Sequence, residues 1–248
     1  MFMKMLKKLV LLFIVFIVAA ASACTATSIN NNNVNQSMTK GVSDMNVKLK
    51  YMGQGTVRII TEENKVIYVD PFAGDDYSMA ADLILQTHDH FDHSALNKVV
   101  NRNKDCQIIT EKEVLANGEH KIFDLPFVKV ISVEAGYNKN HDVNKCVGYV
   151  LEFKNDVKVY LTGDTSKTKQ MAEMSNMNID YAFYCTDGKF NMGNTEAAEC
   201  AKLVNAKHNI PYHNDTSDNS VHFSRKLAEE WDVPNKMIID VNEEVVLK

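Results

Sequence analysis

Residues 87–93 read THDHFDH and place three imidazoles and two carboxylates within seven positions. Imidazole and carboxylate are the ligands that borderline divalent ions prefer. His88 and His90 are two residues apart, so in an extended segment their side chains point to the same side and can bind one ion together. Asp92 and His93 follow in a turn, where they can face a second ion. A charged, His-rich heptad would be costly to bury without a metal, so the pattern predicts a metal site rather than a solvated loop.

Two later segments end in side chains that could complete this site. An apolar run at 159–161 leads to Asp164 within a Gly-Asp-Thr sequence, which delivers a carboxylate at the tip of a strand. Residues 209–213 read NIPYH and deliver the imidazole of His213 in the same way. A Gly-Asp-Thr sequence alone is often only a turn, and a single histidine is more often an ordinary hydrogen-bonded residue. Together with residues 87–93, in this order, they favour one composite metal site.

Strands and helices must position these loops, and hydrophobic periodicity predicts where they lie. Strands are expected at residues 47–52, 56–61, 66–69, 83–86, 107–110, 128–133, 148–153, 157–161, 179–185 and 237–241. Helices are expected at residues 94–101, 111–116, 167–175, 195–205 and 224–231, with Asn194 or Thr195 as the N-cap of the fourth. The strands come mostly as hairpins early and alternate with helices later. This order predicts an α/β fold in which two sheets pack face to face with helices on their outer faces.

The N-terminus carries an export signal that takes no part in the fold. Lysines precede the apolar residues 9–20, and residues 21–24 read ASAC. This pattern resembles a bacterial lipoprotein signal at residues 1–23, after which the thiol of Cys24 is lipidated. The alternatives are an ordinary signal peptide with the same cleavage point and an uncleaved anchor. All versions place the folded part outside the cytoplasm, and lipidation would attach it to the membrane.

The rest of the chain reads as a tether followed by one domain. Residues 24–45 are polar and Asn-rich, which predicts a flexible tether. Residues 46–248 suffice for one domain with a sizeable core. Losing the three lysines of the signal moves the formal net charge from −5 to −8, and an acidic domain without a basic stripe argues against a nucleic-acid partner. The other four cysteines have no CxxC spacing and are expected to be buried thiols: Cys106, Cys146, Cys185 and Cys200.

Taken together, these motifs resemble the metallo-β-lactamase superfamily of metal-dependent hydrolases, in particular its L-ascorbate-6-phosphate lactonase-like branch. The resemblance extends from about residue 51 to residue 213. Besides the heptad it rests on residues 53–59 (GQGTVRI), 69–71 (VDP), 148–150 (GYV), 163–165 (GDT), 187–188 (DG), 192–198 (MGNTEAA) and 210–213 (IPYH). It implies a four-layer αβ/βα sandwich, the metallo-β-lactamase fold, with a dinuclear metal site on its edge.

The resemblance also implies which residues hold the two ions. Six matching positions are expected to act as ligands: His88 and His90 for the first ion, Asp92, His93 and His213 for the second, and Asp164 as a bridge between them. The third imidazole of the first site is expected in the loop before the strand at 148–153, where His141 is favoured and Asn138 is the alternative. Gln54 departs from relatives that have histidine in the first loop, so no substrate contact is predicted for it.

A dinuclear site of this kind predicts hydrolysis. Two divalent ions bring four positive charges, and the carboxylates of Asp92 and Asp164 neutralise two of them. The centre stays net positive and should attract a small anionic or carbonyl-containing substrate. The ions would lower the pKa of bound water and create a nucleophile for a lactone, phosphodiester or thioester. A carboxylate at position 164, where some β-lactamases carry cysteine, makes antibiotic hydrolysis a minor possibility. Zinc is the default metal, and manganese or iron are alternatives.

The competing hypothesis is a lipoprotein that keeps the fold as a non-catalytic metal- or ligand-binding module. The complete set of ligands favours the enzyme. Around the site, Asp187, Asn191 and Met192 are expected to shape the pocket or, equally, to serve turn chemistry. Lys189 is expected to be a solvated lysine, and Phe91 is expected to pack beneath the metal loop.

Overall fold

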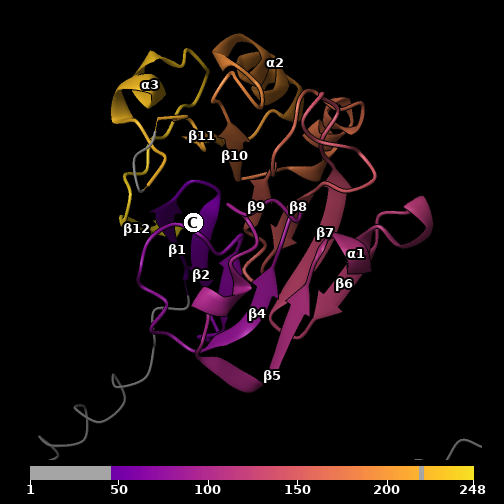
Figure 1. The fold of residues 1–248 in the computed structure, drawn as a ribbon, viewed down its shortest axis with the longest axis vertical. Coiled ribbons are helices and arrows are strands. Elements are labelled where there is room, and N and C mark those ends of the chain that lie inside the picture. Colours follow the sequence, from indigo (N-terminus) through magenta and orange to yellow (C-terminus); the bar gives the residue numbers. More distant parts are fainter. Residues whose placement is uncertain (1–45, 218–220) are drawn as a thin grey trace, which may run out of the picture. The chain divides into compact units, whose positions relative to one another are not determined.

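Two six-stranded sheets face each other in the structure, a computed structural model that describes residues 46–217 and 221–248 (Figure 1). The first sheet has the strand order β12-β1-β2-β3-β4-β5, and the second has the order β11-β10-β9-β8-β7-β6. The first sheet consists of β1 (Val47–Gly53), β2 (Thr56–Ile60), β3 (Val66–Val69), β4 (Ala81–Leu85), β5 (Arg102–Ile109) and β12 (Glu244–Leu247). The second consists of β6 (Ile122–Leu125), β7 (Val128–Glu134), β8 (Val147–Glu152), β9 (Lys158–Leu161), β10 (Tyr181–Cys185) and β11 (His208–Tyr212).

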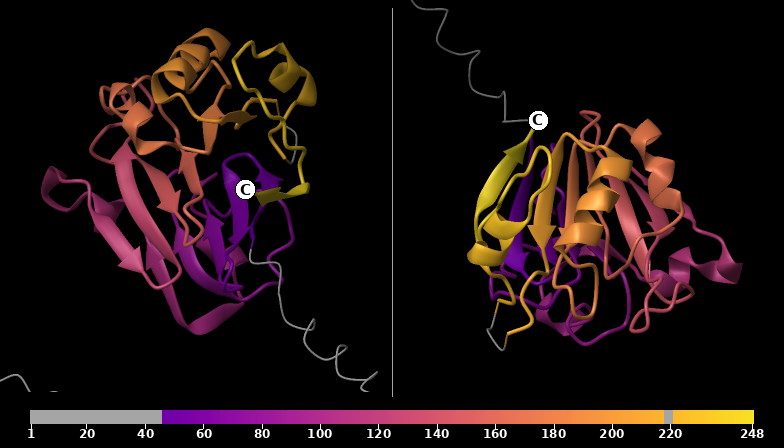
Figure 2. Two further views of the ribbon diagram at one scale, coloured as in Figure 1. Left: turned by 180° about the vertical axis from the view of Figure 1, so that it is seen from behind. Right: turned by 90° about the horizontal axis from the view of Figure 1, so that it is seen from above.

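Helices are few and short in the described part of the chain. The α-helices are α1 (Glu111–Val114), α2 (Asn194–Val204) and α3 (Arg225–Glu230). The 3₁₀ helices are η1 (Leu96–Lys98), η2 (Ala116–Gly118), η3 (Gln170–Ala172) and η4 (Met174–Met177). Figure 2 shows the sheets as adjacent layers, with α2 on the outer side of the second sheet. None of the described helices is long and apolar enough to cross a membrane.

The core fills the space between the sheets. Leu49 and Leu83 from the first sheet belong to the same buried cluster as Leu151 and Phe183 from the second. Removing such side chains from water is the main stabilising contribution to a fold of this size, at roughly 1.5 to 3 kcal/mol for each large one. Trp231, fully buried, joins α3 to α2 because its indole N–H donates to the carbonyl of Asn194 at 3.0 Å.

The predicted α/β architecture of two facing sheets is confirmed. Nine of the expected strands lie within two residues of an observed strand at one end or both. The strands β6, β11 and β12 were not among the expected ranges, although residues 209–213 were expected to deliver His213 from a strand tip. The expected strand at 237–241 is wrong: these residues form no strand in the described structure, and the pairing beside them is a single isolated bridge between Lys236 and Asn209. The strand that completes the first sheet is β12 instead, whose residues 244–247 pair antiparallel with β1.

Two predicted α-helices are also wrong. Residues 94–101 contain only η1, because Ala95 before it (φ −76°, ψ 54°) and Val99 after it (φ −84°, ψ 75°) are not helical. Residues 167–175 form parts of the 3₁₀ helices η3 and η4. The N-cap of α2 is Gly193, without a side-chain cap, rather than Asn194 or Thr195.

The export signal, Cys24 and the tether lie outside the described residues. From residue 46 onward, the described chain belongs to one compact unit. Its four cysteines are free, and three of them, Cys146, Cys185 and Cys200, are buried thiols as predicted, whereas Cys106 is partly exposed.

Candidate metal centre

The carboxyl ends of neighbouring parallel strands bring the candidate ligands to one edge of the two sheets. β3 and β4 are parallel, and so are β9, β10 and β11. The loops after β4, β9 and β11 therefore deliver residues 88–93, Asp164 and His213 to the same region. Ligand sites of open α/β sheets commonly lie at this position, beyond the carboxyl ends of the strands.

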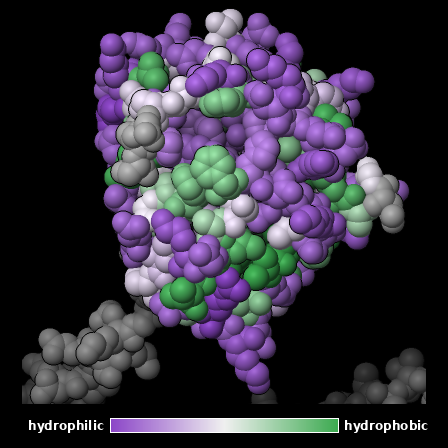
Figure 3. Space-filling model, viewed as in Figure 1, coloured by the Kyte–Doolittle hydropathy of each residue, from purple (hydrophilic) through white to green (hydrophobic). Residues whose placement is uncertain are grey.

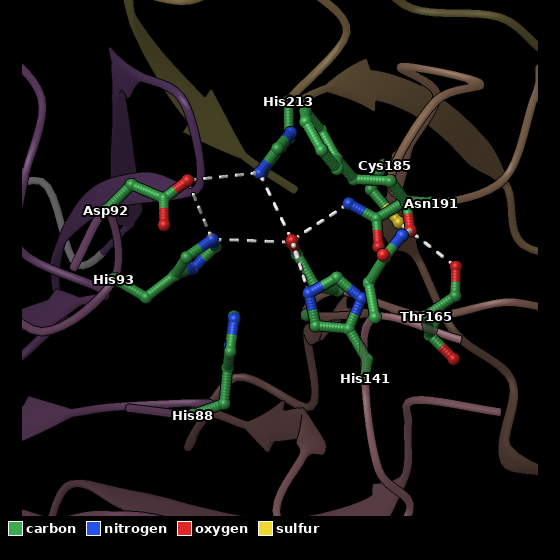
Figure 4. A network of polar contacts seen from close by, with 12 residues as sticks. His88, Asp92, His93, His141, Thr165, Cys185, Asn191 and His213 are labelled. Carbon is green, nitrogen blue, oxygen red and sulfur yellow. Dashed lines mark hydrogen bonds and ion pairs between the residues drawn. The ribbon is translucent and has the colours of Figure 1, made fainter. Parts of the chain in front are cut away.

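All seven predicted ligands meet in three adjoining groups, and within each group the ligand atoms lie within 4.8 Å of one another. These groups are His88, His90 and His141; His88, His93 and Asp164; and Asp92, His93 and His213. Figure 4 shows the rings of His93, His141 and His213 pointing toward one centre.

Asp164 lies between the groups. Its Oδ1 is 3.4 Å from His93 Nε2, and its Oδ2 is 3.3 Å from the Nε2 atoms of both His141 and His213. The side chain is only 5% exposed. A carboxylate in this position can contact an ion in either half of the cluster.

Buried atoms without hydrogen-bond partners show that these residues suit a cation. Nε2 of His88, Nε2 of His93 and Oδ1 of Asp164 are all buried and lack a partner, and they belong to one ligand group. Leaving a polar atom buried and unpaired costs about 1 to 3 kcal/mol. Three such atoms aimed at one point fit a divalent ion with nitrogen and oxygen ligands.

His141, rather than Asn138, belongs to the ligand cluster. Asn138 Oδ1 accepts the backbone N–H groups of Asn140 at 2.9 Å and of His141 at 3.0 Å, and it lies 3.1 Å from His141 Nδ1. An oxygen at that distance favours the tautomer with the proton on Nδ1, which leaves the Nε2 lone pair directed at the cluster. Asn138 therefore orients His141.

Asp70 is the functional residue that sequence reasoning missed. Its Oδ2 lies 2.8 Å from His93 Nδ1 and accepts the Thr87 hydroxyl at 2.6 Å, while its Oδ1 accepts the Thr87 backbone N–H at 2.7 Å. A carboxylate behind a ligating imidazole fixes its tautomer and ring orientation. One feature of the sequence could have pointed to Asp70: it is a carboxylate directly after β3, and β3 lies beside β4, the strand that leads to residues 87–93. Gly55 makes room for Asp70 and His93, because a Cβ at position 55 would lie 2.8 Å from His93 Cε1.

Three residues at the site have left-handed backbone conformations. Gln54, Asp70 and His213 have φ values of 48°, 45° and 44°. Such conformations cost of order 1 to 3 kcal/mol for residues other than glycine and concentrate at functional sites.

The turn role expected for Asp187 is confirmed, whereas neither Asp187 nor Asn191 is among the described residues that line the cavity. Asp187 Oδ1 accepts the backbone N–H groups of residues 189–191, and these hydrogen bonds stabilise the turn. Its Oδ2 lies 3.5 Å from His213 Nδ1. Asn191 Nδ2 donates to Asp164 Oδ2 and to Asp187 Oδ2, both at 2.8 Å, and so holds the Asp164 carboxylate in place. Met192 is buried in the core.

Gln54 contacts the second half of the cluster. Its Nε2 lies 2.6 Å from Asp92 Oδ2 and 2.7 Å from His213 Nε2, and its side chain is almost fully buried. Gln54 therefore holds these two candidate ligands side by side, a contact that the sequence did not predict.

Burial and the neighbouring charges set the protonation states of the cluster. Burial, followed by the proximity of His93, lowers the pKa of His88 well below its usual value. Burial alone would raise the pKa of Asp164, but His213 and His93 outweigh this effect and hold it well below the usual range. Burial would likewise lower the pKa of His93, but the carboxylates of Asp164 and Asp70 raise it to about 10. The cluster thus has an ionised Asp164, a neutral His88 and a His93 that carries a proton.

A cavity of about 490 Å³ opens onto the cluster. Two phenylalanines, Phe91 and Phe190, belong to its wall. The expectation that Phe91 packs beneath the metal loop is wrong, since its side chain is 78% exposed. Lys189 is exposed as expected and is not among the lining residues. Figure 3 shows that hydrophilic side chains cover most of one face of the molecule, with hydrophobic patches between them.

The fold and this His/Asp cluster define a protein of the metallo-β-lactamase fold class. The family model described as "Beta-lactamase superfamily domain" matches residues 48–213, and the chain belongs to this family. Among curated proteins, the chain is 27% identical over 196 residues to a UPF0173 metal-dependent hydrolase from Exiguobacterium sp., covering 68% of this chain and 87% of that protein. A UPF0173 metal-dependent hydrolase from Anoxybacillus flavithermus is 29% identical over 196 residues, with the same shares of the two chains.

Solved structures show the same fold. A metallo hydrolase from the archaeon Ignicoccus hospitalis superposes with a TM-score of 0.61 at 18% identity, covering 82% of this chain and 98% of that one. The metallo-β-lactamase fold protein YhfI from Bacillus subtilis gives a TM-score of 0.57 at 14% identity, covering 80% and 99%.

Proposed function

We propose that this metal-dependent hydrolase of the metallo-β-lactamase superfamily cleaves an ester-type bond with a water molecule activated between two divalent ions. The observation that supports this most strongly is the position of Asp164, 3.3 to 3.4 Å from imidazoles of both halves of the cluster. The family and the curated relatives support the general class, and the ligand geometry supports the dinuclear form.

In this proposal, His88, His90 and His141 hold one ion, Asp92, His93 and His213 hold the other, and Asp164 contacts both. The bound ions would supply an ionised water and a Lewis acid for the scissile group. Zinc is the default for this donor set, with manganese or iron as alternatives.

The protein's own groups position the reaction. Asp70 and Asn138 fix the rings of His93 and His141, so their Nε2 atoms stay directed at the centre. Gln54 holds Asp92 through Oδ2. The Asp92 side chain is 18% exposed and lines the cavity, and in this proposal its carboxylate would take up the proton of the attacking water.

The substrate in this proposal is a small molecule with a lactone, thioester or phosphodiester bond. The resemblance to the L-ascorbate-6-phosphate lactonase-like branch supports a lactone. The export signal and Cys24 support a location outside the cytoplasm with a lipid anchor to the membrane. The net acidic composition supports a function without nucleic acid.

Turnover of a panel of lactones, thioesters and phosphodiesters tests the proposal. Protein loaded with zinc or manganese is expected to hydrolyse at least one class, and protein stripped of metal by a chelator is expected to hydrolyse none. A non-catalytic binding module on the same fold predicts metal binding without turnover of any class. That result would overturn the proposed function.

A further inference from the structure

Two exposed aromatic side chains flank the cavity beside the metal centre. Phe91 is 78% exposed and Phe190 is 44% exposed, and both belong to the cavity wall. Single exposed apolar residues are normal on a protein surface, but large ones gathered at a pocket commonly mark a ligand site. A cavity of about 490 Å³ lies in the range that holds small organic ligands.

Both phenylalanines are held by contacts of their own. The ring of Phe91 packs edge-on against Phe72, with centroids 5.7 Å apart at 86°. Phe190 is fixed through its backbone, where the N–H donates to Asp187 Oδ1 at 2.7 Å and the carbonyl accepts Asn140 Nδ2 at 3.0 Å. A ring that already packs against a neighbour, as Phe91 does, loses less conformational entropy when a ligand packs against it.

The charges of the cavity wall argue against a polyanionic substrate. Its described lining includes the carboxylates of Asp92, Asp164 and Asp215, and neither lysine nor arginine is among the described lining residues. Lys189 Nζ lies 4.8 Å from the centre of the Phe190 ring but does not belong to the wall. Asp92 and Asp164 are candidate metal ligands, so a phosphate group placed away from the metal ions would meet Asp215 and the two rings rather than a lysine or arginine side chain.

We propose, on the basis of the hydrolase function above, that the substrate is an uncharged carboxylic ester or lactone whose apolar acyl chain or ring packs against Phe91 and Phe190. In the reaction, the oxygen of water bonds to the acyl carbon and the acyl C–O bond breaks. One proton of the water goes to the departing alkoxide, and the carboxylic acid product releases the other to solvent. The phenylalanines select the acyl part and take no part in bond breaking.

A homologous series of p-nitrophenyl esters tests this assignment in the metal-loaded full chain. Each fully buried methylene favours binding by about 3- to 4-fold. If two of the four additional methylenes of the hexanoate are buried, kcat/KM for the hexanoate should exceed that for the acetate by about 10-fold. Bis(p-nitrophenyl) phosphate, which has the same leaving group and carries a charge, should be the poorest substrate.

Variants identify the residues responsible. Phe91→Ala combined with Phe190→Ala should reduce the preference for hexanoate over acetate to about 2-fold. Ile122→Ala is the matched control, because Ile122 is also an exposed large apolar residue, at 57%, but does not line the cavity. It should retain the full preference. Equal kcat/KM values for the two esters, or a preference that survives in the double variant, would overturn the inference while leaving the hydrolase function intact.

Inhibitor binding separates this inference from the hydrolase proposal. Hexanohydroxamate and acetohydroxamate share one metal-binding group and differ in the apolar chain, and calorimetry on the metal-loaded chain measures both without turnover. The hexano compound should bind about 10-fold more tightly to the wild type and about 2-fold more tightly to the double variant. If no ester, lactone, thioester or phosphodiester is hydrolysed but this difference is observed, the hydrolase proposal fails and the apolar pocket stands. Equal affinities for the two hydroxamates would reject the pocket.

Discussion

Replacing Asp70 by asparagine should weaken metal binding without removing any ligand. The side chain is 1% exposed, and its Oδ2 serves both the Thr87 hydroxyl and His93 Nδ1. In Asp70→Asn, the amide oxygen is expected to stay with the Thr87 backbone N–H, as Oδ1 does now at 2.7 Å. The new NH₂ group would then point at two other hydrogen-bond donors, the Thr87 hydroxyl and His93 Nδ1–H, and could accept from neither. His93 must either lose this contact or move its proton from Nδ1 to Nε2, and a protonated Nε2 cannot bind an ion.

The expected size of the effect follows from similar carboxylates behind metal-bound imidazoles. Their loss costs about 10- to 100-fold in metal affinity, equivalent to about 1.4 to 2.7 kcal/mol. Competition with a chromogenic chelator measures the zinc affinity of wild type and variant. The ¹⁵N chemical shifts of the imidazole nitrogens report the tautomer of His93 independently.

Asp75→Asn is the matched control for this variant. Asp75 is fully exposed, with Lys98 Nζ at 3.7 Å, so the same change of charge there should leave zinc affinity within about 2-fold. If Asp70→Asn also bound zinc with wild-type affinity and kept the proton of His93 on Nδ1, the positioning role assigned to Asp70 would be refuted.

Three further predictions concern the bridge, the protons and the core. Asp164→Asn should lose one ion by elemental analysis and at least about 100-fold in turnover while keeping its circular dichroism spectrum; unchanged turnover would mean that the bridge is misassigned. Because the pKa of His93 is raised to about 10, the metal-free protein holds this proton at pH 8 and must release it to bind an ion, so apparent affinity should rise with pH up to that value. Calorimetry in buffers of different ionisation enthalpy should detect about one or more protons released per chain, and no release would contradict this reasoning. Trp231→Ala should lower the free energy of unfolding by about 3 to 5 kcal/mol in urea denaturation without changing metal content, and a loss below about 1 kcal/mol would show that the site collapses around the missing ring.

The ligand cluster could be predicted from the sequence because its chemistry is concentrated in short motifs. His88, His90, Asp92 and His93 lie within one heptad, and strands of clear apolar pattern precede them. Residues of this type are too costly to bury without a partner, so their spacing alone indicates a shared ion. The two facing sheets followed from the same strand pattern.

The contacts that orient the ligands could not be predicted, because they join residues far apart in the chain. Asp70 reaches His93 across 23 positions, and Gln54 reaches His213 across 159. The pairing of β12 with β1 joins the two ends of the domain, and its residues 244–247 carry only a short apolar run. The direction of the Phe91 side chain could not be predicted for a different reason. A phenylalanine in such a loop can equally pack into the core or line a substrate cavity, and the sequence does not distinguish the two.

The number of ions bound per chain tests the central claim most directly. Elemental analysis of the full-length protein should find two divalent ions in the wild type and fewer in His141→Ala. His208→Ala, which changes a histidine stacked on Tyr181 and absent from the three ligand groups, should retain two. A wild-type protein without tightly bound divalent ions, or a His141→Ala variant that retains both, would contradict the account.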